Sequence, residues 1–497
     1  MNKKKNLFSA LVLQILTMIS GLILPRIIIG TFGSEINGMV SSITQFLSFI
    51  SLLEGGLGAV ILAELYKPIE VNDHETINSI LNSCQEFFKK LSFVFIIYTI
   101  IVGVVYSIAE KGKYSFAYVC SLVFILSFTT LAQYLFSITN KLLLQAQQKI
   151  YIVNIVMSIT VVAYLLISVV LIYTYPEIHL IKLGSAIAYL LQPIAFNYYI
   201  DNRYKGKRRR VCHTRYDLKS RWDGFAQNLA HFINLNTDVA LITIFSSLVD
   251  VSIYSVYMLS ITALRSIIAS LTNSYQSTLG KYFAQEDFAQ LKRKFEKFDN
   301  MNTVVSMSLF CTCVLLINPF VSIYTSGIKD ANYYQPLFAL IITLANLVYC
   351  IREPYRFIIL AAGRFKETNF GAMMEAILNL TISISLLRWF GLVGIAVGTL
   401  IAVTYRYLYF VYYLKKDILH KDYTEYIFRW GKILILIVLN VIVYYSVSFG
   451  IEGFIDFIIY GMIIFIFEAI ISYLLFIKLN KKALMRGGKN GGKKGLD

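Results

Sequence analysis

Five arginines interrupt apolar stretches of the sequence, where a charged side chain requires a compensating function. They are Arg26, Arg265, Arg352, Arg356 and Arg406. Placing arginine at the centre of a bilayer costs about 2.5–3.5 kcal/mol on insertion scales. A guanidinium group stays charged at any physiological pH and can donate two parallel hydrogen bonds to a phosphate. We therefore predict that these side chains bind an anionic substrate in a cavity. For Arg26, Arg352 and Arg356, which lie near the ends of their spans, the alternative is that the side chain extends to the membrane interface.

Five carboxylates lie in the same apolar stretches, and two roles are open to each of them. They are Asp238, Glu54, Glu353, Glu375 and Glu468. A buried carboxylate can couple transport to Na⁺ or H⁺, or it can neutralise a buried arginine. Pairing with arginine is favoured for Glu353, which precedes a proline, and for Glu375. Coupling to the membrane potential alone would need no such carboxylate.

Polar residues at helical spacing accompany Asp238 and Arg265. Steps of four, three and four residues place Gln227, His231 and Asn234 on the same helix face as Asp238. Two further polar residues, Asn273 and Gln276, follow Arg265. A polar face within an apolar helix contacts protein or water rather than lipid. We expect this face to line the cavity. The six cysteines are scattered without CxxC spacing, so we expect no metal site and no disulfide framework. We also expect no cofactor and no catalytic residue.

The composition is that of a membrane protein with many spanning helices. Of the 497 residues 57% are apolar and 15% charged, whereas soluble domains carry about 25% charged residues. Spans need about 20 apolar residues each. The apolar runs predict fourteen, at about 6–30, 36–63, 90–109, 114–140, 151–175, 180–200, 222–247, 251–280, 301–325, 333–360, 369–388, 391–414, 431–449 and 454–478. The predicted fold class is therefore all-α membrane protein.

The basic residues predict how these spans are oriented. With the N-terminus in the cytoplasm, 36 of the 46 Lys and Arg fall in cytoplasmic segments, five in outer loops and five within spans. This is the positive-inside pattern, and a missed span would invert it. It also explains the net charge of +17 without nucleic acid as a partner. Both termini are expected in the cytoplasm, with the dense basic run at 201–221 contacting anionic membrane lipids.

An internal repeat divides the first twelve spans into two sets of six. Shifting the first set by 216 residues brings LLLQAQQK at 142–149 onto IILAAGRF at 358–365, and a shift of 210 brings LGSAIA at 183–188 onto VGIAVG at 393–398. Six helices that begin and end on one side give a parallel repeat, and such halves surround a central site. The predicted organisation is an N-lobe at 1–200, a cytoplasmic linker at 201–221, a C-lobe at 222–414, two additional helices within 415–478 and a basic tail at 479–497.

The sequence resembles bacterial oligosaccharide-lipid flippases of the Wzx type, in the multidrug/oligosaccharidyl-lipid/polysaccharide (MOP) exporter superfamily. The resemblance lies in LPRIIIGTFG and the following SEINGMVSSITQFLSFISLLEGGLGAVI, in the turn at Leu360 to Phe365, and in VGIAVGT at 393–399. It implies two six-helix lobes that rock about a cationic cavity. Lipid II flippases of this superfamily use arginines on helices one and eight, where this chain has Arg26 and Arg265. In those flippases an acidic residue can follow the helix-one arginine, whereas this chain has Ile27 at that position. The difference favours a glycan other than lipid II as the substrate.

The resemblance implies transport of an undecaprenyl-diphosphate-linked oligosaccharide across the bacterial cytoplasmic membrane, for capsule, O-antigen or another surface polysaccharide. A glycan polymerase or other assembly protein is then an expected partner. One alternative is a cation-coupled exporter of small molecules or drugs from the same superfamily, for which twelve helices and more cavity carboxylates are expected. A different class is a membrane glycan polymerase or glycosyltransferase. Such an enzyme needs catalytic carboxylates near a membrane surface and a large outer loop, and the sequence shows neither.

The orientation makes a direct prediction for the central linker. A cysteine introduced as Lys207→Cys should react with a membrane-impermeant thiol reagent only after the cells are opened, because the linker lies in the cytoplasm. Labelling of this cysteine in intact cells would overturn the whole topology, since every later span would be inverted.

Overall fold

The regular structure of the chain is helical. The computed structural model describes residues 2–54, 57–110, 112–203, 225–362, 364, 367–414, 423–446, 450–451 and 453–478, and all regular elements in these ranges are helices. Thirteen helices or continuous helix runs there are long and apolar enough to cross a membrane. A further helix, α11 (Phe225–Phe245), lies at the predicted span 222–247. The predicted all-α membrane fold is confirmed, and the apolar helices indicate a multi-pass membrane protein.

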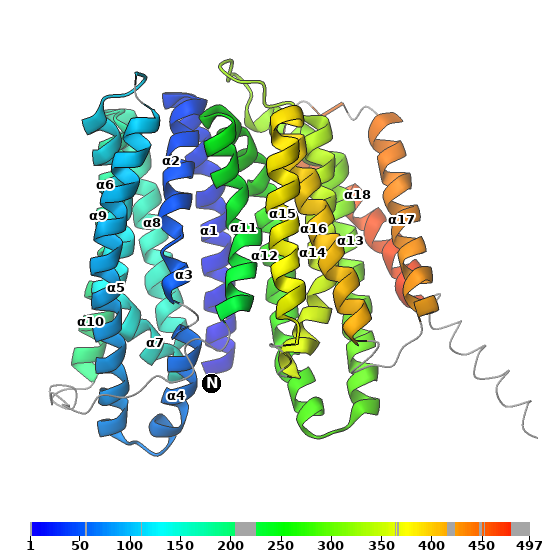
Figure 1. Ribbon diagram of the computed structural model, residues 1–497, viewed down its shortest axis with the longest axis horizontal. Coiled ribbons are helices and arrows are strands. Elements are labelled where there is room, and N and C mark those ends of the chain that lie inside the picture. The colour runs from blue at the N-terminus through cyan, green and yellow to red at the C-terminus, as the bar shows by residue number, and fades with distance from the viewer. Residues whose placement is uncertain are drawn as a thin grey trace, which may run out of the picture. The chain divides into compact units, whose positions relative to one another are not determined.

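The chain forms two compact units, Met1–Phe232 and Ile233–Asp497. The first unit contains six spans (Figure 1), formed by α1 (Asn2–Phe32), α2 (Ser34–Ser48) with α3 (Ser51–Glu54) and α4 (Leu57–Glu70), α5 (His74–Ala109), α6 (Phe116–Ala132) continued by the π-helical η1 (Gln133–Ser137) and α7 (Ile138–Ala146), α8 (Ile150–Thr174), and α9 (Ile178–Tyr189) with α10 (Leu191–Arg203). The second span is therefore interrupted, whereas the sequence predicts one helix over 36–63.

The second unit holds the site described below. Its helices are most of α11, then α12 (Leu248–Ala284), α13 (Phe288–Tyr324), α14 (Pro336–Ala361), α15 (Asn369–Phe390), α16 (Leu392–Leu414), α17 (Tyr423–Ser446), and α18 (Phe454–Tyr473) continued by η4 (Leu474–Lys478). Helices α17 and α18 pack on α13, where Leu315, Leu316 and Ile464 form a buried cluster. The two additional C-terminal helices are thus attached to the second unit.

Several helices extend well beyond the apolar runs that predict them. Helices α12 and α13 have 37 residues each and α5 has 36. At 1.5 Å per residue they are roughly 55 Å long, nearly twice the thickness of the hydrocarbon layer. The start of α5 is fixed by Asp73, whose carboxylate accepts hydrogen bonds from the backbone N–H groups of Glu75 and Thr76. Hydrogen bonds from Thr76 hold the pKa of Asp73 below its ordinary value.

Glycines bring paired helices close together at equivalent positions of the two halves. A Cβ atom on Gly184 of α9 would lie 2.7 Å from Leu171 Cδ1 of α8. A Cβ atom on Gly394 of α16 would lie 2.5 Å from the carbonyl carbon of Leu386 in α15. Small residues allow helix backbones to approach in this way. These two glycines coincide at the 210-residue shift of the sequence repeat.

The α15–α16 contact makes a testable prediction. A Cβ atom on Gly398 would lie 2.8 Å from the backbone nitrogen of Ser383, and backbone cannot move aside. We expect Gly398→Val to lower the free energy of unfolding by about 1–3 kcal/mol, measured as loss of thermal stability in detergent. Gly431→Ala is the control, because nothing lies within 4 Å of its Cβ position. Equal stability of the two variants would contradict the close packing.

Candidate functional site

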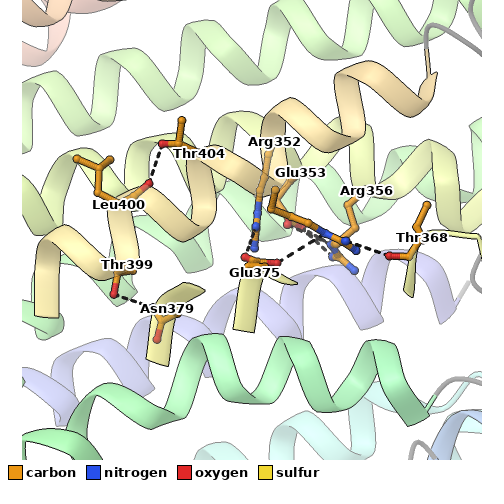
Figure 2. A network of polar contacts seen from close by, with 10 residues as sticks. Arg352, Glu353, Arg356, Thr368, Glu375, Asn379, Thr399, Leu400 and Thr404 are labelled. Carbon is orange, nitrogen blue, oxygen red and sulfur yellow. Dashed lines mark hydrogen bonds and ion pairs between the residues drawn. The ribbon is translucent and has the colours of Figure 1, made fainter. Parts of the chain in front are cut away.

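A buried group of three charges joins α14, α15 and α16 (Figure 2). Arg352 on α14 forms an ion pair with Glu375 on α15, and Arg406 Nε on α16 lies 3.6 Å from Glu375 Oε2. Arg406 also donates a hydrogen bond of 3.0 Å to the backbone oxygen of Thr368. All three residues are at most 4% exposed. One carboxylate therefore balances two arginines, and the group retains a net positive charge.

A second ion pair lies one turn along α14. Arg356 Nε donates to both carboxylate oxygens of Glu353 at 3.1 Å, and its NH2 group donates to Oε2 at 2.7 Å. The Arg356 side chain is 32% exposed, so this pair lies nearer the surface than the group around Glu375. Three of the five predicted cations thus have a carboxylate partner, supplied by the two glutamates for which pairing is favoured.

Arg265 on α12 has a different environment. Its NH1 group donates a hydrogen bond of 3.1 Å to Asn346 Oδ1, and its guanidinium lies 4.0 Å from the ring centroid of Tyr349. The side chain is half-buried, and it forms no ion pair with any residue that the structure describes. The Tyr349 ring also lies 4.6 Å from the Arg352 guanidinium, which connects the two sites. The direct contacts of Arg265 are therefore with neutral groups, and its charge is free of an ion pair within the described part of the chain.

Asp238 on α11 is buried beside hydroxyl and amide groups. Tyr254 and Thr399 donate hydrogen bonds to its Oδ2 atom at 2.9 and 3.3 Å, and Asn379 donates to Thr399 Oγ1 at 3.2 Å. Among the described residues, Asp238 Oδ1 and Asn379 Oδ1 have no hydrogen-bond partner. A carboxylate, an amide oxygen and a hydroxyl are the hard ligands that a small cation prefers. They could equally bind an ordered water.

Arg265 and Asp238 line the same pocket in the second unit. Its walls come from α11, α12, α14 and α16, and include Tyr254, Asn346 and Thr399. The pocket has a volume of about 20 Å³, which is room for about one water molecule. It is therefore suited to a water or a single small cation. A sugar diphosphate could only meet the half-buried Arg265 from outside this pocket.

The first unit contains two of the predicted site residues. Arg26 is half-buried on α1, directly after Pro25. Glu54, at the end of α3, accepts a hydrogen bond from the hydroxyl of Tyr134 in the π-helical segment η1. Such π-helical turns are frequent at functional sites. The broken second span and the π-turn of the fourth therefore meet at Glu54.

The structure does not describe the side chains of five predicted cavity residues: Gln227, His231, Asn234, Asn273 and Gln276. Their backbones belong to α11 and α12. Their place on a polar cavity face therefore stays a prediction.

The sequence patterns miss a buried ion pair between α13 and α17. Arg429 NH1 lies 2.6 Å from Asp299 Oδ2, and the hydroxyl of Tyr355 donates to the same oxygen at 3.0 Å. By sequence both charged residues fall in cytoplasmic segments, just before the predicted spans at 301–325 and 431–449. In the structure both are inside helices, because α13 and α17 begin earlier. Arg429 has apolar and aromatic neighbours in the run YIFRW, and from these a helix that begins before residue 431 could have been predicted.

Comparison with known proteins identifies the fold. No known sequence family and no curated protein sequence matches the chain. Among solved structures, the lipid II flippase MurJ in an inward closed conformation superposes with a TM-score of 0.68 at 15% identity, over 94% of this chain and 98% of that one. The MATE multidrug transporter DinF-BH superposes with a TM-score of 0.62 at 13% identity, over 85% of this chain and 96% of that one. A MOP superfamily transporter from Pyrococcus furiosus gives 0.52 at 13% identity, over 83% and 96%. The chain therefore has the MOP transporter fold.

Proposed function

We propose that the chain transports an undecaprenyl-diphosphate-linked oligosaccharide across the bacterial cytoplasmic membrane by alternating access. The observation that carries this proposal is Arg265, a half-buried guanidinium with neutral supports and no carboxylate partner in the described part of the chain. A diphosphate group is the anion for which a guanidinium provides matched, charge-assisted hydrogen bonds. The paired Arg352, Arg356 and Arg406 would contribute to the positive field around it.

The comparisons support a flippase over the alternative of a small-molecule exporter. The lipid II flippase covers 94% of this chain, whereas the multidrug transporter covers 85%. The flippase fold thus accounts for a part of the chain that the exporter fold leaves unmatched. The identity of 15% is compatible with a different glycan as substrate.

In this proposal Asp238 is the residue that couples transport to a cation. Asp238, with its unpartnered Oδ1 atom, lines the pocket together with Thr399. Asn379, whose Oδ1 atom is also unpartnered among the described residues, donates a hydrogen bond to Thr399 from behind the pocket wall. We expect Asp238→Asn to slow transport and to remove its dependence on Na⁺ or pH, because the amide lacks the charge that holds the cation. Transport by reconstituted protein, measured with and without Na⁺ and at two pH values, checks this. An unchanged dependence on both cations would exclude Asp238 from coupling.

The substrate is tested in a strain that lacks the gene. We expect lipid-linked oligosaccharide to accumulate on the cytoplasmic side, and mass spectrometry of extracted polyprenyl diphosphates would identify its sugars. Normal glycan export combined with increased sensitivity to dyes or drugs would instead support the small-molecule exporter. Accumulation of exported but unpolymerised repeat units would point to a polymerase.

A further inference from the structure

Glu468 is a carboxyl group buried in the middle of α18, in a helix that is otherwise almost wholly apolar. It follows Phe454 by 14 residues and precedes Lys478 by ten, so it lies roughly 21 and 15 Å from the two ends of the span. The residue is 4% exposed. The site described above makes no use of it.

The surroundings of Glu468 contain no compensating charge. In the part of the chain that the structure describes, no lysine or arginine forms an ion pair with it. The groups that face it are the amide of Asn440 on α17 and the thiol of Cys311 on α13. Lys432 of α17 instead contacts η4, where it donates to the backbone oxygen of Leu475 at 3.2 Å. An isolated carboxylate in such a place would carry a large desolvation penalty.

The unsatisfied oxygens at this place indicate what is missing. Glu468 Oε2 and Asn440 Oδ1 are buried without a hydrogen-bond partner among the described residues, and so is the hydroxyl of Ser472 one turn further along α18. The Asn440 amide nitrogen donates one hydrogen to the backbone oxygen of Leu436 at 3.0 Å and the other to the Glu468 carboxyl group. This leaves Glu468 Oε2 and Asn440 Oδ1, which can only accept, without a donor. A hydrogen on Oε2 of the carboxyl group supplies that donor, so that the acid and the amide bond each other in both directions.

We propose that Glu468 binds a proton within the membrane and, as a neutral carboxylic acid, donates it to the side-chain oxygen of Asn440. The bond fastens α18 to α17 and satisfies both oxygens. A proton fits this place better than a metal ion, since it needs one donor and one acceptor, whereas a hard metal ion requires several oxygen ligands. The proposal is independent of the substrate and of the coupling role of Asp238.

Infrared spectroscopy tests the protonation directly. We expect the spectrum of the full-length protein at pH 7, minus that of Glu468→Gln, to show the carbonyl band of a neutral carboxylic acid. Glutamine keeps the shape and a donor for Asn440, so the variant should fold. The control is Asp73→Asn, where an exposed carboxyl that accepts backbone hydrogen bonds should give carboxylate bands instead. Carboxylate bands for Glu468 at pH 7 would overturn the proposal.

A second measurement decides the question if the Glu468→Gln protein does not fold. Dicyclohexylcarbodiimide reacts with neutral carboxyl groups in apolar surroundings. We expect mass spectrometry to find wild-type protein modified at Glu468 at pH 7 and Glu375, between its two arginines, unmodified. Absence of modification at Glu468 at pH 7 would contradict a bound proton.

Discussion

Arg265→Ala should abolish glycan export while the protein remains in the membrane at near-normal abundance. The substitution removes the guanidinium that is proposed to bind the diphosphate, and charge-assisted hydrogen bonds contribute about 1.5–3 kcal/mol each. Loss of two such bonds weakens binding by about 100-fold or more. Folding should tolerate the change, because Asn346 and Tyr349 are neutral and the nearby Asp238 keeps its hydrogen bonds from Tyr254 and Thr399. Export is measured by complementation of the deletion strain.

Two further variants make this result specific. Arg265→Lys keeps the charge but loses the planar bidentate fork, so we expect only partial export. Arg364→Ala is the matched control, since Arg364 is an exposed arginine paired with Glu367, and its loss should leave export unchanged. Full export by Arg265→Ala would remove Arg265 from the mechanism.

Arg429→Ala should be the most destabilising single change among the charged residues of α17. It would leave Asp299 buried without its cation, for which the expected loss in the free energy of unfolding is about 3–5 kcal/mol. The remaining hydrogen bond from Tyr355 at 3.0 Å does not replace the charge. Denaturant titration of the purified protein in detergent micelles measures the loss.

The exposed pair Arg364–Glu367 again provides the comparison. Its side chains are 50% and 41% exposed, so Arg364→Ala should cost no more than about 1 kcal/mol. The double variant Arg429→Ala with Asp299→Ala should lose less stability than the two single variants added together, because no unpaired buried charge remains. A loss for Arg429→Ala as small as that for Arg364→Ala would show that the buried pair does not hold α17 on α13.

The sequence alone determined the class of the protein and the approximate places of its spans. The reason is that the thickness of the hydrocarbon layer sets the length of an apolar run, so each span is a local property of about 20 residues. The same locality made Arg265 and Asp238 stand out, since a charge within an apolar run is costly wherever the helix packs. The ends of the helices could not be predicted in this way, because α5, α12 and α13 continue into polar sequence that no apolar run marks.

Only the tertiary structure decided which charges form ion pairs and which of the described ones does not. Arg352, Glu375 and Arg406 belong to three different helices, and their contact depends on how each helix is rotated and how far it is shifted along its axis. No sequence spacing encodes those quantities. The same holds for Asp299 with Arg429, on helices far apart in the chain, and for Glu468 with Asn440, on two consecutive helices. Residue types and periodicity identify the ionisable groups, whereas the relative placement of whole helices determines their partners.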